Sequence, residues 1–214
     1  MNLKCPLCLQ SNHRFFAQDA QRIYRECFTC KTVFVPPQYF LSSVEEHKRY
    51  DLHTNSPNDR NYRKFLQRML EPIHDRVPPK SCGFDFGSGP GPTLSLMFEE
   101  HGHDMQIYDH FYAHNEDVFE RQYDFITATE VLEHLHRPCA ELQRLWQILK
   151  PGGYLGMMTS RYDAVDDFNS WHYKLDPTHV LFFSTQSFVW LSGQWAATLE
   201  VVDNDIVILR KSDE

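Results

Sequence analysis

The sequence lacks an apolar run approaching the roughly eighteen residues of a membrane-spanning helix, and it begins Met-Asn-Leu-Lys-Cys rather than with a cleavable leader. We therefore expect a cytoplasmic protein without a membrane partner. Repeats and low-complexity tracts are also missing. Basic residues are a minority, with 21 Lys and Arg against 29 Asp and Glu and a net charge of −8, which disfavours nucleic acid as a partner. The 214 residues suffice for one α/β domain and a small appendage.

Cysteine is scarce but informatively placed. Four of the six cysteines form two Cys-x-x-Cys pairs, Cys5 with Cys8 and Cys27 with Cys30. Two such pairs let four thiolates reach one tetrahedral zinc ion. The alternative is a redox pair or a disulfide, which a reducing cytosol disfavours. We predict a structural zinc ribbon over residues 1–36, which is too small for a core of its own and so depends on zinc for folding.

Residues 37–80 are expected to form a helical lid or linker. Ser42 or Ser43 is suited to cap a helix over 44–50, and Asp59 precedes a second helix. A stripe of apolar residues at helical spacing follows Asp59 and is predicted to face the core. Its members are Tyr62, Phe65, Leu66, Met69, Leu70 and Ile73.

The segment FDFGSGPGP, residues 84–92, predicts a strand that ends in a glycine loop before a helix opened by Pro92. Glycine is needed where the backbone takes a positive φ or lies directly against a ligand, so this unit predicts a nucleotide cradle. The dinucleotide pattern G-x-G-x-x-G fails because Pro92 occupies its third glycine position. This departure disfavours a nucleotide-dependent oxidoreductase.

The spacing D-x-G-x-G-x-G resembles motif I of the class I S-adenosylmethionine-dependent methyltransferases. The segments YDFITATEVLEHLHRP and ILKPGGYLGMMT are similar to the branch that includes ubiquinone-pathway O-methyltransferases. The resemblance covers roughly residues 81–209. In that family the motif acid orients the loop and the methionine amino group, and an acid after the second strand accepts the ribose hydroxyls. The resemblance thus implies S-adenosylmethionine as cofactor, with the cofactor-binding residues Asp85, Gly87, Gly89, Asp109 and Glu130.

The resemblance also implies an α/β fold over residues 81–214. We expect a Rossmann-like methyltransferase sheet with helices on both faces and a terminal antiparallel hairpin formed by 198–202 and 206–210. The segment between Asp109 and Asp124 is short for the helix and third strand that this fold places there. The third strand is therefore predicted to be reduced or missing.

Residues 49–55, RYDLHTN, are similar to a segment of small bacterial zinc-ribbon methyltransferases. In related enzymes the N-terminal helices fold over the cofactor, which makes Tyr50, His53 and Asn55 expected lid contacts. The alternative is a turn with capping residues.

An aromatic insertion over 161–180 leaves the carboxyl end of a predicted strand, where substrate pockets of open α/β sheets lie. We expect it to wall the substrate pocket with Trp171 and Tyr173. Packing is the alternative role for both rings.

Glu130, Glu133 and His134 follow the predicted fourth strand at a spacing that would place them on one helix face. The two carboxylates of such a group repel each other unless a bound proton or cation offsets their charge. The same string, completed by a later histidine that here is His179, binds a divalent cation in small-RNA 2′-O-methyltransferases and in some ubiquinone-type enzymes. The resemblance thus implies a second divalent cation that would bind substrate hydroxyls. The alternatives are a solvated helix face, or His134 or His179 as a general base beside Glu133.

Together these features predict an enzyme that transfers a methyl group from S-adenosylmethionine to an oxygen, nitrogen or carbon atom of a small-molecule acceptor. Two alternatives stand beside it. One is an RNA-modifying methyltransferase that docks its substrate through the ribbon, and the other is a non-catalytic S-adenosylmethionine-binding module. No motif identifies the acceptor or the oligomeric state.

Overall fold

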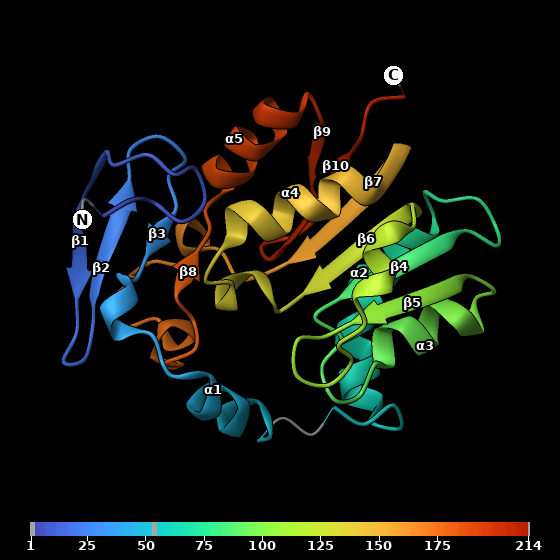
Figure 1. Cartoon of the computed structure of the whole chain (residues 1–214), viewed down its shortest axis with the longest axis horizontal. Coiled ribbons are helices and arrows are strands. Elements are labelled where there is room, and N and C mark those ends of the chain that lie inside the picture. The colour runs from blue at the N-terminus through green and yellow to red at the C-terminus, as the bar shows by residue number, and fades with distance from the viewer. Residues whose placement is uncertain (1–2, 53–54, 214) are drawn as a thin grey trace.

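The structure, a computed structural model, describes residues 3–52 and 55–213, and two sheets organise this part of the chain (Figure 1). The larger sheet contains β4 (Cys82–Phe86), β5 (Asp104–Tyr108), β6 (Tyr123–Thr129), β7 (Leu149–Met158), β9 (Thr198–Val201) and β10 (Ile206–Arg210). The smaller sheet contains β1 (His13–Gln18), β2 (Ile23–Cys27), β3 (Val33–Phe34) and β8 (Leu181–Phe182). The α-helices are α1 (Ser43–Tyr50), α2 (Arg60–His74), α3 (Thr93–Glu100), α4 (Pro138–Ile148) and α5 (Thr185–Trp195).

The larger sheet has the order β5-β4-β6-β7-β10-β9. Its first four strands are parallel, and β10 runs antiparallel between β7 and β9. This is the Rossmann-like sheet with a terminal antiparallel hairpin that the sequence predicts. Because the parallel strands all point the same way, their carboxyl ends meet at one edge, where α/β folds bind ligands.

Helices cover both faces of the larger sheet, as predicted (Figure 1). The alternation along β10 shows this directly, because Ile206 and Ile208 belong to the core beneath α2 and α3 while Val207 and Leu209 belong to the core beneath α4 and α5. Central parallel strands are buried on both faces, which accounts for the nearly continuous burial of β6.

The larger sheet ends at β5, and residues 109–122 add no strand to it. They form a tight turn and a short 3-10 helix, Glu116–Glu120, whose Val118 is buried in the main core. The predicted loss of the third strand is therefore confirmed, and this segment packs against the chain beside β5 instead.

The smaller sheet combines both ends of the chain. Strand β8 pairs antiparallel with β3, placing Phe182 opposite Val33, so the ribbon borrows a strand from residues that follow the aromatic insertion. A shared core contains Tyr24 of the ribbon, Phe168 and Trp171 of the insertion, and Phe182. Residues 1–36 thus share both a sheet and a core with residues 161–183. Within the described ranges, no helix has the length and apolar character that a membrane span requires.

Candidate functional site

A cavity of about 870 Å³ lies at the carboxyl ends of β4, β5 and β6. Three polar atoms in its lining are buried and have no hydrogen-bond partner among the described residues. They are Ser88 Oγ, Thr129 Oγ1 and Glu133 Oε1. Buried polar atoms in proteins are almost always paired, so three orphans in one cavity indicate the place of a polar ligand.

The glycine loop forms one wall of the cavity. Gly87 has a φ of +79°, and its N–H donates to the carbonyl oxygen of Tyr108 at 2.8 Å. A Cβ at Gly87 would come within 2.4 Å of Val131 Cγ2, and one at Gly91 would come within 1.7 Å of the Asn55 carbonyl oxygen. The loop therefore needs glycine both for its backbone conformation and for close packing on its neighbours.

Asp109 joins the glycine loop to the turn after β5. Its Oδ2 accepts from the N–H of Gly89 at 2.9 Å, and its Oδ1 accepts from Phe111 and Tyr112 at 2.9 and 3.1 Å. A carboxylate offers about four acceptor positions, so Asp109 retains capacity for hydroxyl groups of a ligand in the cavity that it lines.

Asp85 lies beneath the glycine loop rather than in the lining of the cavity. It is 4 % exposed, and its Oδ1 accepts from Thr127 Oγ1 at 2.7 Å. Burial raises the pKa of Asp85 to about 6, because removal from water disfavours the charged carboxylate. Its contact with Thr127 supports the strand that ends in the loop.

Residues of helix α1 line the cavity from the side of the predicted lid. Ser42 caps the helix in a reciprocal capping box with Glu45. Tyr50 meets the edge of His134 at a ring distance of 5.2 Å, and burial raises the pKa of its phenol. Asn55 also lines the cavity, whereas His53 lies outside the described residues.

Part of the predicted core stripe also lines the cavity. Leu66, Met69, Leu70 and Ile73 are buried as expected, but Tyr62 and Phe65 are only half-buried and line the cavity. Both rings pack against the core beneath α2 and α3, as predicted, and they line the cavity as well.

The opposite wall carries Glu133, His134 and His179, which are close enough to hold one metal ion, with their ligand atoms within 4.8 Å of one another. Glu133 is fully buried, its Oε2 accepts from Thr159 Oγ1 at 2.9 Å, and its Oε1, which makes no hydrogen bond, lies 3.7 Å from His134 Nε2. His179 Nδ1 donates to the carbonyl oxygen of Tyr173 at 2.7 Å.

The two histidines are oriented in the way metal ligands usually are. A backbone carbonyl only accepts, so the bond to Tyr173 places the ring proton of His179 on Nδ1 and leaves a lone pair on Nε2. His134 Nδ1 lies 3.3 Å from the carbonyl oxygen of Thr178. Burial lowers the pKa of His179 to about 4, so this imidazole is neutral near pH 7, the form that binds metals.

Glu130 lies outside this three-residue group. Its φ of +51° and a 3-10 turn over Leu132–His134 replace the expected α-helical turn, so the predicted common helix face does not form. Glu130 lines the cavity, and its Oε2 accepts from Tyr173 Oη at 3.4 Å. Burial and then the charge of Glu133 raise the pKa of Glu130 to about 9, so it is protonated near neutral pH.

The insertion divides its aromatic residues between two places. Tyr173 lines the cavity, as the sequence analysis expects. Trp171 is buried against Phe168 and Phe182 in the core shared with the ribbon. Phe111, which no motif singles out, also lines the cavity and stacks on His47 of α1 at a ring distance of 4.8 Å.

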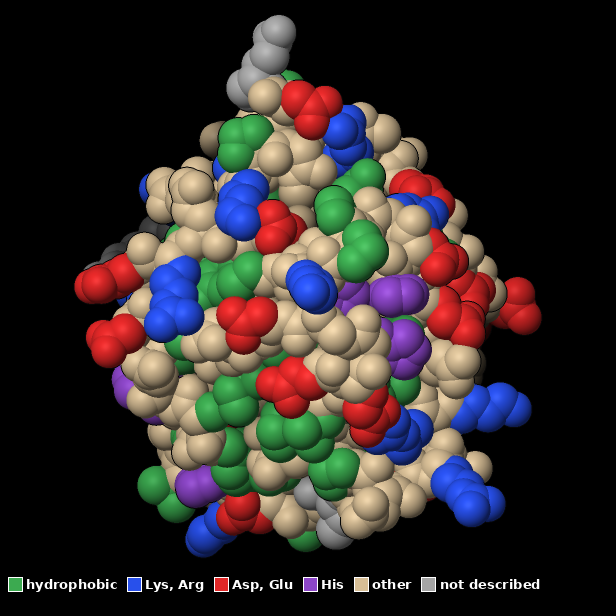
Figure 2. Space-filling view, turned by 90° about the vertical axis from the view of Figure 1, so that its right-hand side faces the viewer, with side chains coloured by type: hydrophobic (Ala, Val, Ile, Leu, Met, Phe, Trp, Pro, Cys, Tyr) green, Lys and Arg blue, Asp and Glu red, His purple; other side chains and the backbone are tan. Residues whose placement is uncertain are grey.

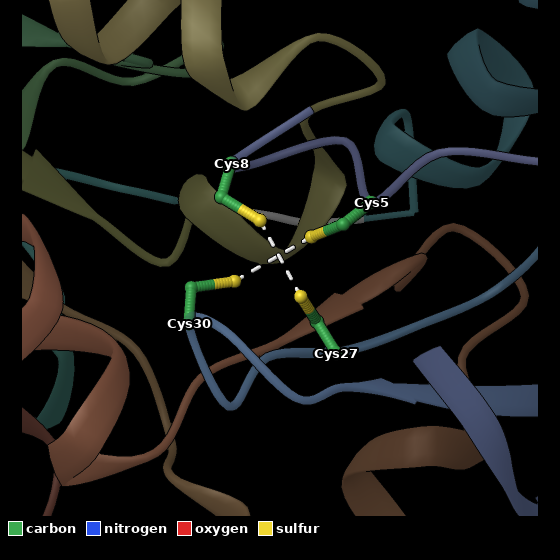
Figure 3. A group of neighbouring side chains, drawn as sticks. All are labelled: Cys5, Cys8, Cys27 and Cys30. Atoms are coloured by element: carbon green, nitrogen blue, oxygen red, sulfur yellow. Dashed lines mark hydrogen bonds between the residues drawn. The ribbon is translucent and has the colours of Figure 1, made fainter. Parts of the chain in front are cut away.

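The side chains of the four ribbon cysteines point toward one another at the end of β2 (Figure 3). Cys5 Sγ lies 3.5 Å from Cys30 Sγ, and Cys8 Sγ lies 3.3 Å from Cys27 Sγ, distances too long for disulfides. All four are buried, and hydrogen bonding to Cys30 raises the pKa of Cys5. Four buried thiols around one point fit a closed, tetrahedral zinc site.

Comparison with known proteins places these features in a family. A family model described as a methyltransferase domain matches residues 54–203, most of the chain. A curated ubiquinone biosynthesis O-methyltransferase of Shewanella pealeana is 30% identical over 84 residues, which are 39% of this chain. The matched part spans 36% of that relative, which is about a third of the relative's own length.

Solved structures show the same fold at low identity. A Burkholderia thailandensis 1,6-didemethyltoxoflavin-N1-methyltransferase, solved with its substrate and S-adenosylhomocysteine, has a TM-score of 0.54 at 16% identity and covers 94% of this chain and 100% of its own. Magnesium protoporphyrin IX methyltransferase from Synechocystis PCC 6803, solved with S-adenosylmethionine, has a TM-score of 0.50 at 13% identity and covers 82% and 94%.

Proposed function

The chain belongs to the class I S-adenosylmethionine-dependent methyltransferases, and we propose that it methylates an oxygen, nitrogen or carbon atom of a small-molecule acceptor held beside Glu133, His134 and His179. One observation carries this proposal. The glycine loop and the group of Glu133, His134 and His179 line the same cavity, and orphaned polar atoms lie on both walls. Donor and acceptor sites therefore adjoin, as a direct transfer requires.

S-adenosylmethionine supplies the electrophilic methyl group when it is bound. The glycine loop and Asp109 would hold it, since Gly87 and Gly89 keep the loop free of side chains and Asp109 has acceptor capacity left for ribose hydroxyls. Ser88 Oγ and Thr129 Oγ1 are further polar partners on that wall. Tyr50 and Asn55 cover it from the lid side.

The opposite wall would position and deprotonate the acceptor. A divalent cation on Glu133, His134 and His179 would have three protein ligands and so keep positions open for acceptor oxygens. Glu133 Oε1 fits this use, because a buried carboxylate oxygen that makes no hydrogen bond needs a cation or a donor. Without a cation, His134 or His179 would accept the proton of the acceptor as a general base.

A small-molecule acceptor is favoured over RNA by charge. The chain carries a net charge of −8. On the face drawn in Figure 2, Lys and Arg are interspersed with Asp and Glu and form no continuous basic stripe. The solved relatives named above include enzymes for compact heteroaromatic and macrocyclic acceptors, which supports the same choice.

The experiment is a screen of metabolite fractions with the purified protein and S-adenosylmethionine, with release of S-adenosylhomocysteine as the readout. Fractions are divided by ultrafiltration and by ribonuclease treatment, so activity in the small, ribonuclease-resistant fraction supports the proposal. Activity confined to large, ribonuclease-sensitive material would instead establish the RNA-modifying alternative. S-adenosylmethionine binding measured by calorimetry without turnover in any fraction would favour the non-catalytic module.

A further inference from the structure

Arg22, on the turn that enters β2 of the ribbon, reaches the turn that carries His179. Its Nη1 donates to the carbonyl oxygens of Pro177 at 3.2 Å and His179 at 2.9 Å. Its Nη2 donates to the carbonyl oxygens of Lys174 and, at 3.2 Å, Asp176. One guanidinium thus gathers four carbonyls of residues 174–179, in the planar fork geometry that only arginine offers.

Burial of the Arg22 guanidinium costs solvation free energy that other polar groups must offset. Arg22 is 5 % exposed, and a buried cation is tolerated only where dipoles or charges replace its water. The four carbonyls of the turn replace that water, while Nε of Arg22 is buried without a partner. The guanidinium also lies over the ring of Tyr24 in the ribbon, with Cζ 5.5 Å from the ring centre, so it joins the ribbon to residues 174–179.

Other contacts tie the same turn to both the ribbon and the site. Val180, the residue after His179, accepts from the N–H of Val35 in the ribbon at 2.9 Å and donates to the carbonyl oxygen of Glu133 at 2.8 Å. Lys174 is 4 % exposed and its Nζ lies 3.3 Å from Asp19 Oδ2. A continuous set of hydrogen bonds therefore runs from the ribbon to two of the three residues that could hold a cation.

We propose that Arg22 is a positioning residue through which the zinc ribbon holds residues 174–179, so that His179 meets Glu133 and His134. The ribbon is then a structural part of the acceptor wall and not a separate module. The use of that wall for an acceptor or a cation rests on the proposed function, but the positioning of His179 is tested independently of it.

The test uses the full chain with the variant Arg22→Met. Mn²⁺ is the probe for the Glu133, His134 and His179 group, because this hard ion is a poor match for the thiolates of the ribbon. Binding is followed by electron paramagnetic resonance, and amide hydrogen exchange is measured over residues 172–183. We expect at least tenfold weaker Mn²⁺ binding and at least tenfold faster exchange of the Val180 amide. Zinc content and affinity for S-adenosylhomocysteine stay within twofold of the parent protein.

Arg25→Met is the matched control. Arg25 lies three residues further on, in β2, and its Nε donates to His13 Nδ1 at 2.9 Å, inside the ribbon. All readouts should stay at parent values in this variant. An equal loss in Arg25→Met would overturn the proposal, because it would show general weakening of the ribbon. Parent-like exchange and Mn²⁺ affinity in Arg22→Met would overturn it as well.

Arg22→Lys decides the question if the methionine variant does not fold. Lysine keeps the charge but cannot span four carbonyls, so we expect faster exchange in residues 172–183 with normal zinc content, and parent-like exchange would overturn the proposal. If the parent protein binds no Mn²⁺, the cation part of the proposed function fails. The exchange contrast between the Arg22 and Arg25 variants then still decides whether Arg22 positions His179.

Discussion

The glycine-loop half of the cavity, residues 86–90 with Asp109, is held by neighbouring strands of one sheet. The histidine half, residues 130–134 and 173–179, is held by distant parts of the chain. In the first half, Gly89 bonds Asp109 across one strand connection. In the second, Arg22 bonds the carbonyl of His179 across 157 positions of sequence. The first half is thus a product of local chain geometry, and the second depends on the ribbon being folded.

Removal of zinc should produce the largest effect and separate the two halves. We expect Cys27→Ser to lose the ion, which contributes about 10–16 kcal/mol to the folding of zinc-finger peptides. Since Tyr24 and Val33 of the ribbon share a core with Phe168, Trp171 and Phe182, residues 172–183 should lose hydrogen-exchange protection before β4 and β5 do. Elemental analysis and exchange mass spectrometry measure both effects.

The control is Cys139→Ser, which removes a thiol outside the cluster of four. This variant should keep zinc and parent-like exchange. If Cys27→Ser instead lowers protection equally in the glycine loop and in residues 172–183, the two halves form one cooperative unit and the comparison above is wrong.

Removal of the His179 imidazole should lower turnover but leave cofactor binding unchanged. We expect His179→Ala to lower turnover about 1000-fold, within the range typical for loss of acid–base or metal assistance, because the acceptor wall loses its neutral imidazole. Affinity for S-adenosylmethionine should stay within twofold, as measured by calorimetry. His172→Ala, at an exposed position of the same insertion, should leave both quantities unchanged.

Chelation followed by addition of Mn²⁺ or Mg²⁺ tests whether a cation acts in the histidine half. If a cation acts there, chelation should stop turnover in the parent protein and either ion should restore it, with circular dichroism showing that the ribbon stays folded. Full activity of metal-free, folded protein would remove the cation and leave His134 or His179 as the base.

Substitution in the glycine-loop half should give the reverse pattern. We expect Asp109→Ala to weaken S-adenosylmethionine binding about 30-fold, or about 2 kcal/mol, through loss of two ligand hydrogen bonds and of the bond that holds Gly89. Mn²⁺ binding on the histidine side should not change. The control is Asp104→Ala, at the exposed start of β5, the strand that Asp109 follows. This variant should bind S-adenosylmethionine normally. Unchanged affinity in Asp109→Ala would contradict the cofactor assignment.

The two halves also differ in how far the sequence predicts them. Strand β4, the glycine loop and helix α3 follow one another as the segment 84–92 predicts from its glycine and proline positions alone. Each of these features depends on residues within one turn or one strand. The missing third strand was predictable for the same reason, because chain length between Asp109 and Asp124 is a local quantity.

The histidine half could be predicted only in part. Glu133, His134 and His179 are recognisable as a group from a family pattern, but the left-handed backbone of Glu130 has no local signal and removes it from the expected helix face. Arg22 carries no motif, and its role is visible only once residues 174–179 are placed beside β2. Contacts between remote segments therefore set the limit of prediction here.

The smallest predicted effect concerns the stability cost of the glycine-loop half. Asp85 is buried with a pKa of about 6 against an ordinary value of 3.8. Its folded-state pKa is raised, so its contribution to stability is fully present below pH 3.8 and is lost as the pH rises through 6. Asp85→Asn keeps an acceptor for Thr127 but has no charge to bury. Between pH 4 and 7 we expect the variant to gain about 2 kcal/mol relative to the parent, measured by urea unfolding without ligand.

Asp124→Asn is the control of opposite sign. The Lys150 ammonium at 2.7 Å and the Cys82 N–H at 2.8 Å hold the pKa of Asp124 below its ordinary value despite partial burial. Its contribution to stability is therefore present above the ordinary pKa and is lost as the pH falls, so the asparagine variant should lose stability at pH 7 relative to pH 4. If both variants changed in the same direction with pH, burial of Asp85 would not be the cause. The carboxylate beneath the glycine loop would then have to be neutralised by a partner instead, and even the locally built half of the cavity would depend on more than its own strands.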